Sequence, residues 1–151
     1  MTDPNAYDDN YGTCYKTSAA FRVMHADLNP DTVSQGLNLQ PDWAYHKGQP
    51  RGGRNTPSKF GIWGFETDNK IASRDLRHHL DWLLDLLEPH QAMLFSCQER
   101  GYNLDVFCMW VKAGGTGGPT LSPRNMARLA SLNLPISIEF WSHEDEEDAN
   151  D

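Results

Sequence analysis

The sequence predicts an α+β domain in which a mainly antiparallel sheet of about five strands packs against about four helices. Leucines in the stretch 76–87 recur at helical spacing, whereas apolar residues in the stretch 104–112 alternate as they do along a strand. Shorter apolar runs, separated by residues that favour turns, supply the remaining elements. A chain of 151 residues is long enough for one domain whose core needs no disulfide or metal.

The first half of the chain predicts three strands and one short helix. Strands are expected at 15–24, 43–46 and 60–67. The helix follows Asn29, a residue type that caps helix N-termini, and Pro30 fits its first position. A polar loop rich in Gly and Pro joins the second and third strands, so these two strands can form a hairpin with a long loop.

The clearest helix is expected to begin near Ser73, which can cap it. Its core-facing stripe consists of Leu76, Leu80, Leu83, Leu84 and Leu87. Pro89 ends this helix and can begin the next one, which runs to Arg100. Gly101 then suits the left-handed conformation that often follows a helix.

The strand at 104–112 carries apolar residues on both faces. Even-numbered residues from Leu104 to Trp110 form one face, and odd-numbered residues from Phe107 to Val111 form the other. Such a pattern is typical of a central strand with cover on both sides. Ser122 then caps a helix with Pro123 at its first position, and residues 136–140 form a last strand.

The element order is therefore β-α-β-β-α-α-β-α-β. It contains the βαββαβ core of ferredoxin-like folds, with the second helix broken in two and an extra C-terminal αβ. The folded part is expected at 14–142 as a single α+β domain. Residues 1–13 lack an apolar period and are expected to be a flexible N-terminal arm. Residues 143–151 are expected to be an acidic disordered tail.

Charge and cysteine content narrow the function classes. A formal net charge of −8 argues against nucleic-acid binding, because phosphate contacts need a basic face. The three cysteines lack zinc-site spacing, so we expect reduced thiols in the cytoplasm. No N-terminal apolar run indicates a signal peptide or a membrane span. No pattern indicates a metal or a cofactor, so neither is expected.

Two loops have features of anion-binding sites. The loop 47–59 contains basic residues and no acidic one, and the loop 114–118 is glycine-rich and precedes a helix N-terminus. If the two loops share one anion, its ligands are Lys47, Arg51, Arg54, Gly117, Gly118, Thr120 and Ser122. The alternative is a solvated hairpin loop, together with a turn that needs positive φ and a Ser122 that only caps its helix.

A second stripe runs along the flank of the main helix, and it is a candidate partner surface. It consists of Asp75, His79, Trp82 and Leu86. The alternative is that the next helix or the N-terminal arm covers it. His78 and His79 lie at metal-ligand spacing from Asp75, but a third ligand is missing, so ordinary surface histidines are favoured.

Several phrases resemble a known family. They are Trp43-x-x-x-Lys47-Gly48-x-Pro50, Arg54-x-x-Pro57, Gly61-x-Trp63, His79-Leu80-x-Trp82-Leu83-Leu84 and Gly117-Gly118-Pro119-Thr120-Leu121-Ser122-Pro123. In this order they resemble the bacterial family called domain of unknown function 4279, over about residues 15–141. The resemblance implies a bacterial, stand-alone cytoplasmic domain. It brings no catalytic residues.

Donors for an anion are present in the sequence, but an acid, a base or a nucleophile with a partner is not evident. We therefore expect a binding or protein-interaction module that recognises an anionic group or a partner protein, as immunity or adaptor proteins do. The alternative is an enzyme that holds a phosphate- or carboxylate-bearing small molecule in the glycine-rich loop. An enzyme needs a pocket with convergent titratable groups, whereas a module needs an apolar face or groove.

Overall fold

A five-stranded mixed sheet forms the centre of the molecule in the computed structural model, which describes residues 2–50 and 55–143. The strands are β1 (Cys14–His25), β2 (Trp43–Tyr45), β3 (Gly61–Glu66), β4 (Asn103–Lys112) and β5 (Ile136–Ser142). Their order across the sheet is β2-β3-β1-β4-β5, with β4 and β5 parallel and the other neighbours antiparallel. The predicted α+β class with a five-stranded sheet is confirmed.

The helices are α1 (Pro30–Leu37), α2 (Leu76–Leu87), α3 (Gln91–Glu99) and α4 (Pro123–Ser131), with a 3₁₀ turn at Glu88–His90. Side chains of Asn29 and Ser122 cap α1 and α4 as expected. The expected start of α2 is corrected from Ser73 to Asp75, whose carboxylate accepts a hydrogen bond from the backbone of Arg77. In the described part of the chain, no helix is long and apolar enough to cross a membrane.

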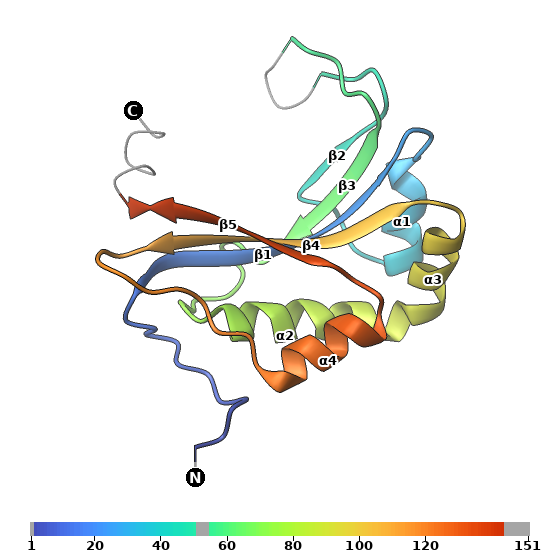
Figure 1. The fold of residues 1–151 in the computed structure, drawn as a ribbon. Coiled ribbons are helices and arrows are strands. Elements are labelled where there is room, and N and C mark those ends of the chain that lie inside the picture. Colours follow the sequence, from blue (N-terminus) through green and yellow to red (C-terminus); the bar gives the residue numbers. More distant parts are fainter. Residues whose placement is uncertain (1, 51–54, 144–151) are drawn as a thin grey trace.

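The core lies between the helices and one face of the sheet (Figure 1). The leucine stripe of α2 is buried there, and Leu83 is 0 % exposed. Alternate residues of β1 point into the same layer, among them Phe21 and Val23. Trp110 of β4 is also buried, at 1 % exposed. Removal of this apolar surface from water is the main term that stabilises the fold.

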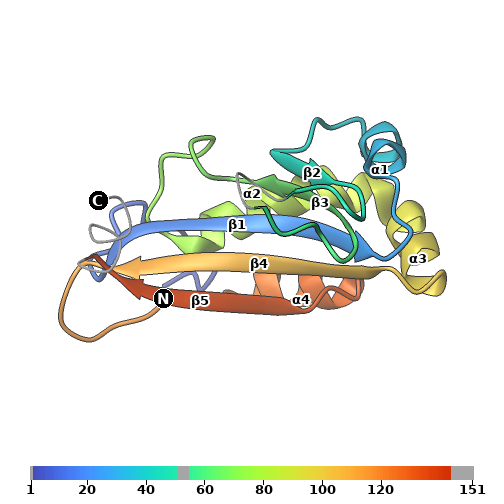
Figure 2. The same ribbon diagram turned by 90° about the horizontal axis from the view of Figure 1, so that it is seen from above.

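The other face of the sheet has no helix over it in the described part of the chain (Figure 2). Leu104, Val106 and Cys108 of β4 are buried against the helical layer, and Trp110 is buried on the same face beside Tyr11 and Phe140. On the other face, Val111 is 0 % exposed, whereas Phe107 and Met109 are only half-buried. Over the described residues, the expected cover on this second face is therefore seen only at Val111. β4 is an interior strand, as predicted, because β1 and β5 flank it.

The N-terminal arm (residues 1–13), which was expected to be flexible, makes specific contacts with α2 and α4 over its described residues. The hydroxyl of Tyr7 donates to Asp81 at 2.5 Å, and its ring stacks on His78 with centroids 4.4 Å apart. The backbone of Asp8 donates to the carboxylate of Asp75 at 2.6 Å. These contacts anchor the arm to the start of α2.

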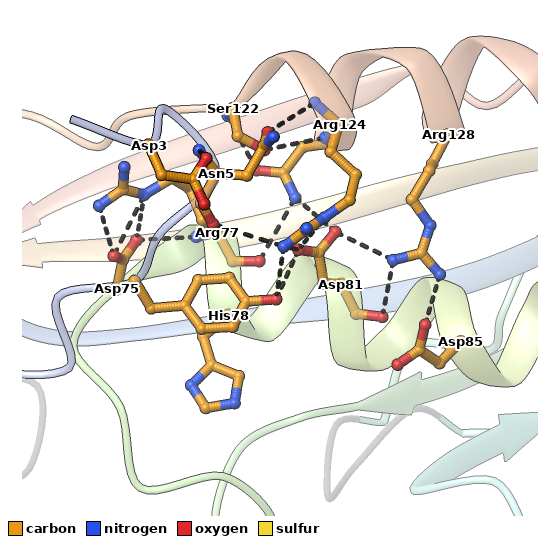
Figure 3. Close-up of polar contacts among 12 residues, drawn as sticks. Asp3, Asn5, Asp75, Arg77, His78, Asp81, Asp85, Ser122, Arg124 and Arg128 are labelled. Atoms are coloured by element: carbon orange, nitrogen blue, oxygen red, sulfur yellow. Dashed lines mark hydrogen bonds and ion pairs between the residues drawn. The ribbon is translucent and has the colours of Figure 1, made fainter. Parts of the chain in front are cut away.

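Asp81 is the centre of this polar network (Figure 3). Its carboxylate is 4 % exposed and accepts hydrogen bonds from Tyr7, Arg124, Asn125 and Arg128. Burial alone would raise the pKa of the Asp81 carboxyl, but the hydrogen bonds from Tyr7 and Arg124 outweigh it and lower the pKa below its usual value. The network thus joins the arm, α2 and α4 around one ionised group. Residues 144–151 of the expected acidic tail lie outside the described residues.

We expect Leu83→Ala to lower the free energy of unfolding by about 2–5 kcal/mol, because it leaves a cavity in the core. Chemical denaturation measures this change. Met126→Ala on α4 is the control, since Met126 is 52 % exposed and its truncation should change stability by less than about 0.5 kcal/mol. An unchanged midpoint for Leu83→Ala would contradict the placement of α2.

We expect Tyr7→Phe to destabilise the protein by about 1–2 kcal/mol, because the buried Asp81 carboxylate loses a hydrogen bond while the stacked ring remains. Deletion of residues 2–12 should have a larger effect. Tyr15→Phe is the matched control: Tyr15 is 42 % exposed, and within the described residues its hydroxyl has no hydrogen bond. Equal melting temperatures for the deletion variant and the full chain would show that the arm adds nothing.

Candidate functional site

A groove runs along β1 on the uncovered face of the sheet, and we call it the β1 groove. Small side chains form its floor: Ser18 and Ala20 are 7 % and 5 % exposed. Larger side chains form its walls, Trp43 and Ile62 on one side and Phe107 and Met109 on the other. The hollow measures about 360 Å³. Its shape follows from small residues on the central strand and large ones on both neighbouring sides.

Trp43 depends on a glycine beneath it. Trp43 pairs with Gly64 across β2 and β3. A Cβ atom at position 64 would lie 2.0 Å from Cε2 of the indole, far inside van der Waals contact. The indole therefore lies directly on the backbone of β3, and Gly64 is required for this wall of the groove.

Arg22 closes one end of the β1 groove and is fully engaged. Its Nε and Nη2 donate to the two carboxylate oxygens of Asp105 at 2.9 and 2.6 Å. The guanidinium carbon lies 4.5 Å from the centroid of the Phe107 ring. This fork-to-fork geometry fixes the side chain, and the pair leaves little net charge at this end.

Glu66 lies on the β3 side of the groove, where it pairs with Ala20, and it has no such partner. Within residues 2–50 and 55–143, its carboxylate makes no hydrogen bond or ion pair, although Asp68 lies nearby. Burial raises the pKa of the Glu66 carboxyl above its usual value, and the charges of Asp68 and Asp42 raise it further. The charges of Lys70 and Lys16 oppose this rise only in part, so a half-buried carboxylate is held in the groove with incomplete compensation among the described residues.

A second hollow, the edge pocket, lies beside the first half of β1 and shares Asp68 with the groove. It measures about 630 Å³ and is lined mainly by polar side chains of the arm, β1 and the segment 68–74. β3 pairs only with Ala20 to His25 of β1, so the segment after β3 forms the far wall of this pocket. Arg74 is exposed at its rim.

His79 lies in the depth of the edge pocket and is held on both ring nitrogens. Nδ1 lies 2.6 Å from the hydroxyl of Thr67, and Nε2 lies 2.8 Å from the carbonyl of Ser73. The carbonyl can only accept, so Nε2 carries the proton and Nδ1 accepts from Thr67. Burial lowers the pKa of His79 below its usual value, which keeps the ring neutral. His79 therefore braces the segment after β3.

Asp9, Ser73 and His78 meet near this pocket but not in a catalytic arrangement. Asp9 accepts from the Ser73 hydroxyl at 2.6 Å and contacts Nδ1 of His78 at 2.8 Å. Hydrogen bonds from Ser73 and then from His78 lower the pKa of Asp9. Nucleophilic catalysis needs the base bonded to the nucleophile, whereas here the carboxylate lies between the hydroxyl and the imidazole.

The cysteines are buried and unpaired. Burial raises the pKa of the Cys14 thiol to about 11 and that of Cys108 to about 12. Thiols with such pKa values are protonated at neutral pH and are poor nucleophiles. Cys97 and Cys108 are 3 % and 0 % exposed.

The structure does not bring the two predicted anion loops together over their described residues. Lys47 is exposed in the connection that leads to Gly61, which pairs with His25 at one end of β1. The glycine-rich loop follows Lys112, which pairs with Cys14 at the other end. Figures 1 and 2 show the two connections far apart, and the length of β1 between them is about 36 Å. Arg51 and Arg54 lie outside the described residues.

The glycine-rich loop already uses its polar groups within the fold. The Tyr11 hydroxyl contacts the Gly118 carbonyl and the Thr120 hydroxyl at 2.9 and 2.8 Å. Ser122 is 1 % exposed and forms a capping box with Asn125. Gly117 packs against Thr13. These contacts agree with the alternative interpretation, in which the loop is a turn followed by a helix cap.

The predicted partner stripe on α2 is also largely internal. His79 is 1 % exposed, so the expectation that it lies on the surface is wrong, because the segment after β3 folds over it. Trp82 stacks on Phe65 with ring centroids 6.1 Å apart, and Leu86 packs against the core. Among the described residues, no group of three or more side chains could hold a metal ion.

Sequence reasoning missed the β1 groove, although one signal was present. The odd-numbered face of β4 was recognised as apolar but interpreted as covered. Small residues at positions 18 and 20 and a tryptophan at 43 alternate with core residues, which is the pattern of a face that is open to a ligand. Only the strand order brings these positions side by side.

Comparison with known proteins agrees with the motifs in the sequence. No curated protein and no solved structure matches the chain. A family model described as "Domain of unknown function (DUF4279)" matches residues 13–143, which is most of the chain. The predicted family is thereby confirmed, and the chain belongs to the DUF4279 family.

Proposed function

We propose that this protein is a binding module, most simply a protein-interaction module, and that the β1 groove is its binding site. One observation carries the proposal. Over the described residues, helices cover a single face of the sheet, and the other face holds a groove with an aromatic side chain in each wall. Apolar side chains gathered on an open face mark interaction sites more often than they mark solvent-facing surface.

The groove has the composition of a recognition site. Trp43, Phe107 and Met109 offer apolar and aromatic contact area, which binding surfaces use as anchors. The Arg22–Asp105 pair supplies polar groups at one end, and Glu66 supplies a carboxylate on the β3 side. Since Arg22 and Phe107 are held by their neighbours, this part of the site is formed before a ligand arrives, which lowers the entropy cost of binding.

An enzyme acting on a phosphate- or carboxylate-bearing molecule is the weaker candidate. Near the edge pocket, the hydroxyls of Thr67 and Ser73 and the imidazole of His79 serve structural hydrogen bonds. The thiols of Cys14 and Cys108 are buried and protonated. The glycine-rich loop that was to hold the anion uses its hydroxyls internally. A binding module is therefore the better-supported function, and we do not propose an anion site at the glycine-rich loop.

We further infer that β1 to β4 form a ferredoxin-like core. β1 and β2 are both antiparallel to β3, so they are parallel to each other with β3 between them. β3 and β4 are likewise parallel with β1 between them. Two interleaved β-α-β units support this inference. A bacterial cytoplasmic location also belongs to the proposal, and the unpaired thiols of all three cysteines support it.

We expect Glu66 to serve binding at a cost to stability. Glu66→Gln should therefore raise the melting temperature at pH 7 in the absence of a ligand. The raised pKa means that the folded state disfavours the ionised carboxyl. The gain should disappear as the pH falls through the folded pKa toward the usual value of 4.5, where the wild-type carboxyl is protonated too. Thermal melts at several pH values measure it. Glu99→Gln, an exposed change on α3, should leave stability unchanged.

A neutral aromatic probe tests the site itself. Benzyl alcohol added to the nitrogen-15-labelled protein should shift the amide signals of Ser18 to Arg22 and of Phe107 to Met109. Trp43→Ala should weaken these shifts, whereas Trp141→Ala should not, because Trp141 is exposed but lies outside the groove. Shifts that gather at the edge pocket around Arg74, or no shifts at all, would contradict the proposal.

A further inference from the structure

The charges around the β1 groove favour one class of ligand over others. This inference rests on the proposed function, in which the groove is the binding site. We propose that the groove binds an extended segment of a partner protein and that a lysine or arginine side chain of that segment pairs with Glu66. The proposal commits to a basic protein segment. A small organic amine is the other source of the same chemistry, and the experiment below separates the two.

Each charged side chain that the structure describes around the groove can be assigned to an ion pair except the carboxylate of Glu66. Arg22 is paired with Asp105 at 2.6 Å, Lys70 with Asp42 at 2.5 Å, and Lys16 with Asp68 at 3.8 Å. Among the described residues around the groove, Glu66 is the carboxylate that no cation contacts directly, although the charges of Lys70 and Lys16 act on it from a distance. Over these residues three carboxylates face two lysines, so the complementary group for Glu66 is a cation.

The surroundings of Glu66 suit a cation on an aliphatic stem. Glu66 follows Gly64 by two residues on the same face of β3, so it lies next to the indole of Trp43. The face of an indole attracts an ammonium or guanidinium group, and Lys and Arg carry apolar stems that the walls can cover. Ile62 and Met109 line the groove and supply that apolar contact.

The shape of the groove favours an extended chain as the occupant. Its floor follows β1 from Ser18 to Arg22, a distance of about 13 Å, which is the length of about four extended residues. The groove is partly open to solvent. A neighbouring residue of the segment can then reach the Arg22–Asp105 pair, which lies two positions along β1 from the residue that pairs with Glu66.

The net charge of the whole protein acts in the same direction. At −8, the chain attracts a basic partner at long range and repels nucleic acid and anionic membranes. Glu66 adds the short-range part. A half-buried carboxylate without a partner is unfavourable in the free protein, and a bound cation removes that penalty.

The experiment uses the full-length nitrogen-15-labelled protein and two short peptides. One peptide alternates Lys and Thr, and the other has Gln in place of every Lys. The Lys peptide should shift the amide signals of Ser18 to Arg22 and should bind about tenfold more tightly than the Gln peptide. Glu66→Gln should weaken the Lys peptide by about tenfold and leave the Gln peptide unchanged. Glu99→Gln, which removes the same charge elsewhere, should have no effect.

Equal affinities of the two peptides, or an unchanged affinity in Glu66→Gln, would overturn the inference. If benzyl alcohol still shifts the groove residues in that case, the proposed binding site stands and only its preference for a cation is wrong. Butylammonium is the third probe. If it binds at the groove as tightly as the Lys peptide does, the occupant is a small amine and the protein-partner inference fails.

Discussion

The two faces of strand β1 lie in different surroundings: one packs into the core under the helices, and the other forms the floor of the groove. The rest of the structure depends on this division. The strand is hydrogen-bonded to β3 on one side and to β4 on the other. Ala19, Phe21 and Val23 fill the core layer between the sheet and the helices. On the opposite face, the short side chains of Ser18 and Ala20 leave space for the groove. A larger side chain at either of these two positions would fill the groove, and a smaller one at 21 would open a cavity in the core.

The elements of the fold were predictable because their signals are local. The leucines of α2 and the caps at Asn29 and Ser122 are read from neighbouring residues. The start of α2 was placed two residues early because Ser73 and Asp75 are both capping types. Asp75 is the cap in the structure, where it also binds the backbone of Asp8, a contact across 67 positions that no local pattern contains. The parallel placement of β5 beside β4 depends on such long-range packing as well.

The candidate site was less predictable, since its residues come from four strands and each is unremarkable alone. The apolar face of Phe107 and Met109 was visible in the sequence, but alternation cannot tell whether a layer covers it. Glu66 becomes notable only when its neighbours are known to be paired elsewhere. The exposure of His79 was predicted wrongly. Helical spacing placed it on the flank of α2, but the segment that contains Thr67 and Ser73 folds over it and buries it.

The contact between Trp43 and Gly64 has an evolutionary consequence. Any side chain at position 64 would occupy the space of the indole ring, so the constraint acts in one direction. Alanine at 64 displaces the tryptophan and removes one wall of the groove, whereas Trp43 can be replaced while Gly64 stays. We therefore expect substitution at 43 to precede substitution at 64 in any line of descent that changes both.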